Sequence, residues 1–270
     1  MQPQGNEGVA KGRQHWANHR GAPRVIQLEQ RLVERYPHWF EGPKAVLAQG
    51  LARSIAKFGR LDDINAWLAA NGHRTGFDFV EGVLDHFGTR YTVDQVERGR
   101  IPQTGRVIIV ANHPLGALDS LALLHLVGSV RRDVRILAND FLMEFEGLRE
   151  LLLPLRILGG KPIAESLIAV TAALEAEQAV IVFPAGEVAR FGWRGVQDGR
   201  WRAGFVKFAR ESGAPVLPVR IKAKNSALFY GLSSLSKPVG TALLRREWFQ
   251  ARGRRIDERF GLPRRRVAAA

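Results

Sequence analysis

Cysteine is absent from this chain of 270 residues. Its absence excludes disulfides, cysteine nucleophiles and thiolate metal sites together, and it fits an intracellular, reducing location. The seven histidines show no spacing that is typical of a metal site. We therefore expect neither a bound metal nor covalent catalysis through a thiol.

Long apolar runs are absent as well. No stretch reaches the roughly 18 uninterrupted apolar residues that a membrane-spanning helix needs. The most apolar segment, Leu151 to Leu158, is interrupted by Pro154 and Arg156. Residues 1–20 lack the apolar core of a signal peptide. We expect a cytoplasmic protein, and any work at a membrane to take place on the membrane surface.

Acidic residues are few beside basic ones. Forty Lys and Arg stand against 26 Asp and Glu, which gives a formal net charge of +14 and a pI near 11.0. Such a charge favours polyanionic partners, meaning nucleic acid, an anionic membrane surface or an acidic carrier protein. Nine arginines and only three acidic residues lie between Arg245 and Arg266. This run fits a solvated face and a lipid-headgroup surface equally well.

The residues that are present predict an α/β protein, because 46% of them are hydrophobic and short aliphatic runs alternate with helical stretches. Residues 1–22 are expected to be a flexible arm, residues 23–88 a helical extension that packs on the main domain or on a membrane surface, and residues 263–270 a basic tail. Residues 89–262 are expected to form a mainly parallel sheet flanked by helices. Strands are predicted at 89–96, 106–111, 134–138, 156–158, 179–184 and 215–221, and helices at 61–71, 76–87, 120–128, 141–153, 164–178, 202–212 and 225–249.

The buried strand at 106–111 ends in Asn112-His113-Pro114, and Asp119 follows at the start of the next helix. Open α/β sheets bind their ligands at the carboxyl ends of strands. A carboxylate bonded to one imidazole nitrogen fixes the tautomer, so that the other nitrogen can accept a proton from a substrate hydroxyl. The alternative is that Asp119 only caps a helix and His113 only ends a strand.

Two further segments carry prolines at predicted strand ends. One is Phe183-Pro184-Ala185-Gly186-Glu187, and the other runs from Pro215 to Arg220 through Pro218. Prolines in strands mark edges or bulges, where the backbone departs from regular pairing. Three such departures near one sheet edge are expected to define a pocket.

These three segments resemble the successive blocks of the glycerophospholipid acyltransferase superfamily, and are most similar to its bacterial haemolysin-like and lyso-ornithine-lipid acyltransferase branch. The similarity spans about residues 80–262. It implies transfer of a fatty acyl group from a thioester, on acyl carrier protein or coenzyme A, to a lysolipid hydroxyl. It also implies that no cofactor stays bound and that the protein associates peripherally with the inner face of the cytoplasmic membrane.

The resemblance implies that His113 is the general base and that Asp119 orients it. Many family members have an arginine for the acceptor phosphate where this chain has Val188, so either Arg190 or Lys161 replaces it or the acceptor has no phosphomonoester, as in a lyso-ornithine lipid. Glu187 then meets a headgroup amine, or is only a helix-start carboxylate. The other residues implied to bind substrate or shape its pocket are Asn112, Pro114, Gly116, Phe183, Pro184, Gly186 and Pro218.

Two other classes of function are alternatives to acyl transfer. A basic chain with Trp193, Trp201 and an arginine-rich tail also fits binding of nucleic acid, or of a membrane surface, without catalysis. No helix-turn-helix, zinc or RNA-binding signature supports nucleic acid as the partner. Serine hydrolysis is disfavoured because the chain has no G-x-S-x-G motif, and Gly159-Gly160-Lys161 is followed by proline, unlike a P-loop.

Overall fold

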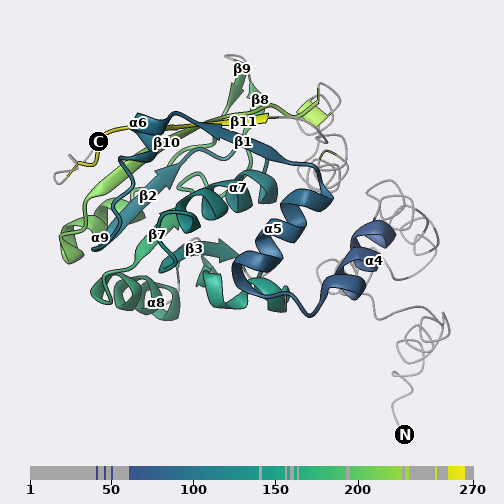
Figure 1. The fold of residues 1–270 in the computed structure, drawn as a ribbon, viewed down its shortest axis with the longest axis horizontal. Helices are drawn as coiled ribbons and strands as arrows, with labels where there is room; N and C mark the ends of the chain where they lie inside the picture. The colour runs from purple at the N-terminus through teal and green to yellow at the C-terminus, as the bar shows by residue number, and fades with distance from the viewer. Residues whose placement is uncertain are drawn as a thin grey trace, which may run out of the picture.

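The computed structural model describes residues 41, 46, 50, 61–139, 142–155, 157–158, 161–162, 164–192, 195–226, 229–230, 247 and 255–264. Its centre is a seven-stranded sheet in the order β1-β11-β10-β2-β7-β3-β4 (Figure 1). Every neighbouring pair is parallel except β10 and β11. The predicted α/β class with a mainly parallel sheet is confirmed. The strands are β1 Arg90–Val93, β2 Val107–Ala111, β3 Val134–Asn139, β4 Leu152–Leu155, β7 Ala179–Val182, β10 Val216–Lys222 and β11 Arg255–Phe260.

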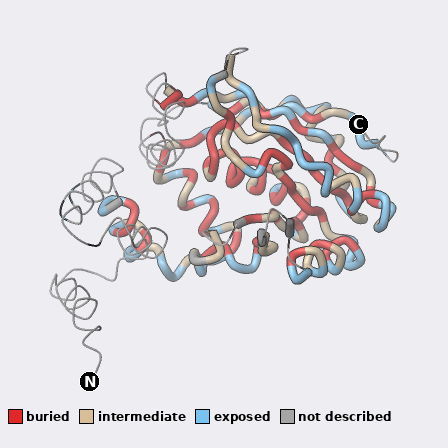
Figure 2. Tube along the Cα trace, turned by 180° about the vertical axis from the view of Figure 1, so that it is seen from behind, coloured by how far each residue is buried: buried red, intermediate tan, exposed pale blue. Residues whose placement is uncertain are grey.

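Helices cover both faces of the sheet, and strand β2 shows why. All five of its residues are buried, and side chains alternate between the two faces of a strand. Ile109 packs in the cluster formed with α5 (Gly76–His86) and α7 (Ala117–Gly128). Ile108 packs in the cluster formed with α8 (Ala164–Glu175) and α9 (Gly204–Ser212). Buried residues accordingly run along the central strands and α7 (Figure 2).

The helices before the sheet share this core. Ile64 and Leu68 of α4 (Leu61–Asn71) and Phe79 and Val80 of α5 belong to the same cluster as α7. Helix α5 approaches α7 closely at Gly128, where an added Cβ would lie 2.0 Å from the ring of Phe77. Larger residues at position 128 would therefore push the two helices apart. The described segments contain no helix with both the length and the apolarity to cross a bilayer.

Several predicted elements differ from the structure. In place of a helix at 141–153 there are two 3-10 helices, η3 Leu142–Glu144 and η4 Glu146–Leu151, followed by the edge strand β4. The strand predicted at 156–158 is only β5 (Ile157–Leu158), which pairs with β6 (Lys161–Pro162) in a separate hairpin. The strand predicted at 89–96 ends at Val93 because Asp94 caps the short helix α6 (Gln95–Arg98). Most of the helix predicted at 225–249 falls outside the described residues.

Strand β11 is the largest difference, because the sequence predicted no strand there. It comes from the arginine-rich stretch and lies inside the sheet, between β1 and β10. Part of that stretch is therefore structural, and not only a solvated face. Pro218, expected near an edge or a bulge, lies in the interior strand β10. One extra residue on the β11 side separates the pairs Val219–Phe260 and Val216–Arg264, so the bulge is present beside the proline.

Candidate active site

His113 and Asp119 meet at the carboxyl end of β2. Nδ1 of His113 lies 2.8 Å from Oδ1 of Asp119, without the alignment of an ideal hydrogen bond. The Asp119 side chain is completely buried and the His113 side chain is 16% exposed. The prediction that these two side chains meet is confirmed. The second ring nitrogen of His113 does not face Asp119, so it can exchange a proton with a substrate.

The turn between the two residues is built from local hydrogen bonds. Gly116 has φ 82° and ψ −128° and stands immediately before helix α7. A residue with a side chain rarely adopts this φ, so glycine permits the sharp entry into the helix. The other carboxylate oxygen of Asp119 accepts a hydrogen bond of 2.6 Å from the backbone N–H of Leu115. Asp119 therefore closes its own turn while it faces the imidazole.

The backbone of His113 is held on both sides by the segment that follows β7. Its carbonyl accepts a hydrogen bond of 2.9 Å from the N–H of Ala189, and its own N–H donates to Oδ1 of Asp198 at 3.3 Å. The other oxygen of Asp198 accepts from Nε1 of Trp201 at 2.9 Å. The ring of Phe183 lies 4.4 Å from the imidazole, centroid to centroid. Sequence reasoning missed Asp198, for which no local motif offers a signal.

The electrostatic surroundings favour the protonated imidazole. Burial lowers the pKa of His113, but the charge and hydrogen bonding of Asp119, together with the charge of Asp198, outweigh it, and the net pKa lies above its usual value. A proton accepted by this imidazole is therefore stabilised as it arrives. Such an arrangement suits a general base that holds a proton briefly and then releases it.

Asn112 and Pro114 are held by structural contacts. The side-chain amide of Asn112 donates to the carbonyl of Ile221 at 2.8 Å and accepts from the N–H of Ile221 at 2.7 Å, as a backbone pair in a sheet would. The carbonyl of Pro114 accepts a hydrogen bond of 2.9 Å from the buried Asn225. These contacts fix the ends of the motif to the end of β10 and to the segment beyond it. Substrate binding by either residue stays a prediction.

The segment after β7 carries the other predicted acceptor residues. Pro184 accepts a hydrogen bond from the N–H of Arg202, and Gly186 has a positive φ of 66°. Nε of Arg190 lies 3.5 Å from Oε2 of Glu187, within ion-pair distance. Val188, the position at which the resemblance leads one to expect an arginine, packs against the buried pair Phe229 and Tyr230. At position 188 an apolar contact therefore replaces the expected arginine.

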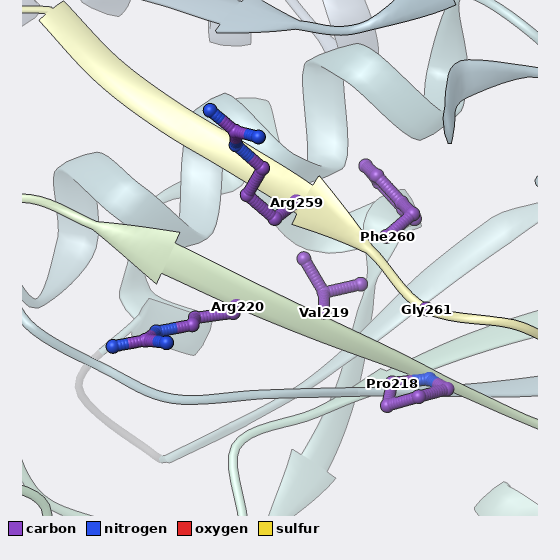
Figure 3. Close-up of a pocket in the computed structure, with 6 residues that line it drawn as sticks. All are labelled: Pro218, Val219, Arg220, Arg259, Phe260 and Gly261. Carbon is purple, nitrogen blue, oxygen red and sulfur yellow. The ribbon is translucent and has the colours of Figure 1, made fainter. Parts of the chain in front are cut away.

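Two other predicted residues lie on other elements. Lys161 stands in the β5–β6 hairpin, and its side chain is outside what the structure describes. Pro218 lines a shallow pocket of about 310 Å³ on the β10–β11 surface, together with Arg220 and Arg259 (Figure 3). A second pocket of about 500 Å³ lies beside α6. Neither pocket is lined by the His–Asp pair, so the acyl channel beside that pair stays a prediction.

A second buried carboxyl group, that of Glu258, is influenced by the charge of Asp119. Glu258 of β11 is completely buried, and neither of its carboxyl oxygens has a hydrogen-bond partner among the described residues. Its strand-face neighbours Ile256 and Phe260 pack in the cluster that contains α7. Burial, and then the charge of Asp119, raise the pKa of Glu258 well above its usual value. The surroundings of this side chain therefore favour its neutral form.

Comparison with known proteins identifies the family. A family model described as "Acyltransferase" matches residues 45–269. The chain belongs to this acyltransferase family. The chain is also 30% identical over 180 residues to the lyso-glycine lipid O-acyltransferase of Phocaeicola vulgatus, which covers 66% of the chain and 63% of that relative. It is 29% identical over 247 residues to the protein of the same name from Bacteroides thetaiotaomicron, which covers 88% of each.

Several solved structures show similarity to the chain, and one of them can be named. It is the 1-acyl-sn-glycerophosphate acyltransferase PlsC from Thermotoga maritima, with a TM-score of 0.42 and 18% sequence identity over 88% of this chain and 78% of that one. Across the described ranges, no group of three or more His, Asp or Glu side chains is arranged to hold a metal ion.

Proposed function

We propose that this protein transfers a fatty acyl group from an acyl thioester, on coenzyme A or acyl carrier protein, to a hydroxyl group of a lysolipid. The observation that carries the proposal is the contact of 2.8 Å between His113 and the buried Asp119 at the end of β2. A binding protein has no need for an imidazole held in this way. The enzyme acts on the membrane surface, where its acceptor resides.

The chemistry needs only these side chains and the two substrates. Nε2 of His113 takes the proton of the acceptor hydroxyl as its oxygen attacks the thioester carbonyl carbon. The tetrahedral intermediate collapses, the carbon–sulfur bond breaks, and the thiolate receives the proton from the imidazolium. Asp119 stabilises that imidazolium between the two steps. One ester bond replaces one thioester bond, and no net proton is consumed.

The acceptor is a lipid whose headgroup carries an amino acid and no phosphomonoester. Val188 offers no charge for a phosphate and is packed against Phe229 and Tyr230. The neighbouring Glu187 and Arg190 form a pair of opposite charges. A lyso-ornithine headgroup offers an amine to Glu187 and a carboxylate to Arg190, and a lyso-glycine headgroup offers the carboxylate alone. The names of the two curated relatives support this class of acceptor.

A reconstituted assay tests the proposal. Purified protein is given acyl-coenzyme A or acyl carrier protein thioester together with lyso-ornithine lipid, lyso-glycine lipid or 1-acylglycerol-3-phosphate, and products are measured by mass spectrometry. We expect O-acylation of a lyso-amino-acid lipid by the natural chain and not by His113→Ala. Acylation of the phosphate acceptor alone would overturn the acceptor class, and equal turnover by His113→Ala would overturn the mechanism.

A further inference from the structure

The segment bonded to His113 also carries exposed aromatic side chains. It comprises β8 (Arg190–Gly192), β9 (Gly195–Gln197) and the loop 198–202. Phe191 is 57% exposed and Trp201 is 42% exposed. Among the described residues these are the only large aromatic side chains with so much exposure; the other exposed large hydrophobics are the aliphatic Val46, Val96, Ile168 and Leu262. Exposed apolar side chains rimmed by polar residues are typical of surfaces that bind a protein or a membrane.

The acidic and basic side chains of this segment have different surroundings. The carboxylate of Asp198 accepts hydrogen bonds from the N–H of His113 and from Nε1 of Trp201. Arg200 and Arg202, on either side of Trp201, are exposed. A tryptophan whose N–H is bonded inward, whose ring is exposed and whose neighbours are cationic has the composition of a membrane-interface anchor. Lipid headgroups of negative charge attract such arginines.

The position of the segment fits the same use. The β8–β9 hairpin projects from one end of the sheet, beyond β11 and β10 in both views (Figures 1 and 2). At its base the N–H of Ala189 bonds to the carbonyl of His113, so the hairpin is fixed to the backbone of the base itself. When the protein rests on a bilayer through this hairpin, the imidazole of His113 lies near the membrane. The acceptor lipid then has only a short way to move to reach it.

We propose that the β8–β9 hairpin and the loop 198–202 form a docking surface for an anionic lipid bilayer, in which Phe191 and Trp201 enter the headgroup layer and Arg200 and Arg202 contact lipid phosphates. The inference rests on the proposed function, since the acceptor is a lipid, and it assigns the surface by which that function reaches its substrate. The hairpin is thus both a support for His113 and the contact with the membrane.

The lack of cysteine makes a direct test available. Phe191→Cys and, as a matched control, Ile168→Cys on the exposed side of α8 are labelled with a polarity-sensitive fluorophore. Ile168 is 66% exposed and lies on α8, a different element from the proposed surface. On vesicles of phosphatidylglycerol and phosphatidylcholine we expect a blue shift for the label at position 191 and none at 168. Equal shifts at both positions, or no shift at 191, would overturn the docking surface.

Vesicle affinity gives a second measurement. Phe191→Ser is expected to weaken sedimentation with these vesicles by roughly tenfold, and Arg200→Ser or Arg202→Ser by about fivefold each. Ile168→Ser and Arg210→Ser are the matched controls and are expected to bind as the natural chain does. Vesicle binding by Phe191→Ser that equals the natural chain, or salt-sensitive binding to DNA in place of vesicles, would overturn the proposal.

Activity separates this inference from the proposed function. With an acceptor dispersed in detergent micelles, Phe191→Ser is expected to turn over as the natural chain does. With the acceptor embedded in vesicles, its rate is expected to fall in proportion to its binding. A natural chain without acyltransferase activity would refute the proposed function, while the fluorophore and sedimentation results would still decide the docking surface.

Discussion

The imidazole of His113 lies 2.8 Å from the carboxylate of Asp119, and the same carboxylate accepts the backbone N–H of Leu115. The Asp119 side chain therefore fixes both the turn that carries the imidazole and the imidazole itself. Removing the carboxylate changes the electrostatics of His113 and the entry into α7 together. Asp119→Asn keeps the size of the side chain and removes its charge, so it is more informative than a substitution that removes the whole carboxylate.

His113→Ala is expected to lower kcat by roughly 10² to 10⁴, because general-base catalysis is typically worth this much. Asp119→Asn is expected to have a smaller effect, since the base remains. The measurement is the steady-state rate with a saturating acyl thioester. His73→Ala serves as the control, because His73 is exposed in the turn after α4. A His113→Ala variant with the natural rate would contradict the assignment.

The rise of kcat/KM on the acid side of its pH profile is expected to depend on the same two side chains, His113 and Asp119. The pKa of His113 is above its usual value of 6.5 despite burial, because Asp119 and Asp198 outweigh the desolvation. The base works only when it is neutral, so kcat/KM is expected to rise with pH through this raised pKa. Asp119→Asn removes the main favourable charge, so its acid limb is expected to move to lower pH. An unmoved limb would show that Asp119 does not set the protonation of the base.

Glu258→Gln is expected to stabilise the protein at neutral pH. Burial and then Asp119 raise the pKa of Glu258 in the fold, whereas the unfolded chain ionises near 4.5. Stability is therefore lost as pH rises from the unfolded pKa towards the folded one, at about 1.4 kcal/mol per pH unit. The variant lacks this loss.

Urea unfolding at a series of pH values measures the difference between Glu258→Gln and the natural chain. The two are expected to differ little below the unfolded pKa and increasingly above it. A constant difference at every pH would mean that the buried carboxyl group does not titrate in this way.

Val188→Arg is expected to shift acceptor preference towards 1-acylglycerol-3-phosphate, because it restores a bidentate phosphate ligand to the acceptor segment. It also costs stability, since Val188 packs against Phe229 and Tyr230. Val196→Arg is the matched control, because Val196 packs against the same two residues. Rates with both acceptors, compared between the two variants, separate specificity from lost packing. The same shift in Val196→Arg would contradict a local phosphate site.

Asn112→Ala is expected to cost about 1 to 3 kcal/mol of unfolding free energy, because it leaves the N–H and carbonyl of Ile221 without the amide that pairs with both. Thermal and urea unfolding measure this loss. If Asn112 acts only as a brace, the KM for the acceptor at low temperature is expected to stay near its natural value. A large rise in KM with little loss of stability would instead support the predicted role in substrate binding.

The parallel sheet and the His–Asp pair were accessible from the sequence because their determinants are local. A run of four aliphatic residues with no charge, Val107 to Val110, is typical of a strand buried on both faces. The turn from His113 to Asp119 closes within a few residues, and its glycine marks the bend. The structure of such segments depends on steric and hydrogen-bonding contacts between residues that are close in the sequence.

Strand β11 was not accessible in the same way. Its core-facing positions read Ile256, Glu258 and Phe260, so a carboxyl group interrupts the apolar alternation that predicts a strand. Only the completed sheet provides β1 and β10 as pairing partners on both sides of β11. That pairing compensates for the burial of Glu258. The contacts of Asp198 with His113 and of Asn112 with Ile221 join residues 85 and 109 positions apart. The sequence by itself determined the motif that we propose to carry the chemistry. The pairing of distant segments decided what holds that motif in place, because contacts of this range depend on the whole sheet having formed.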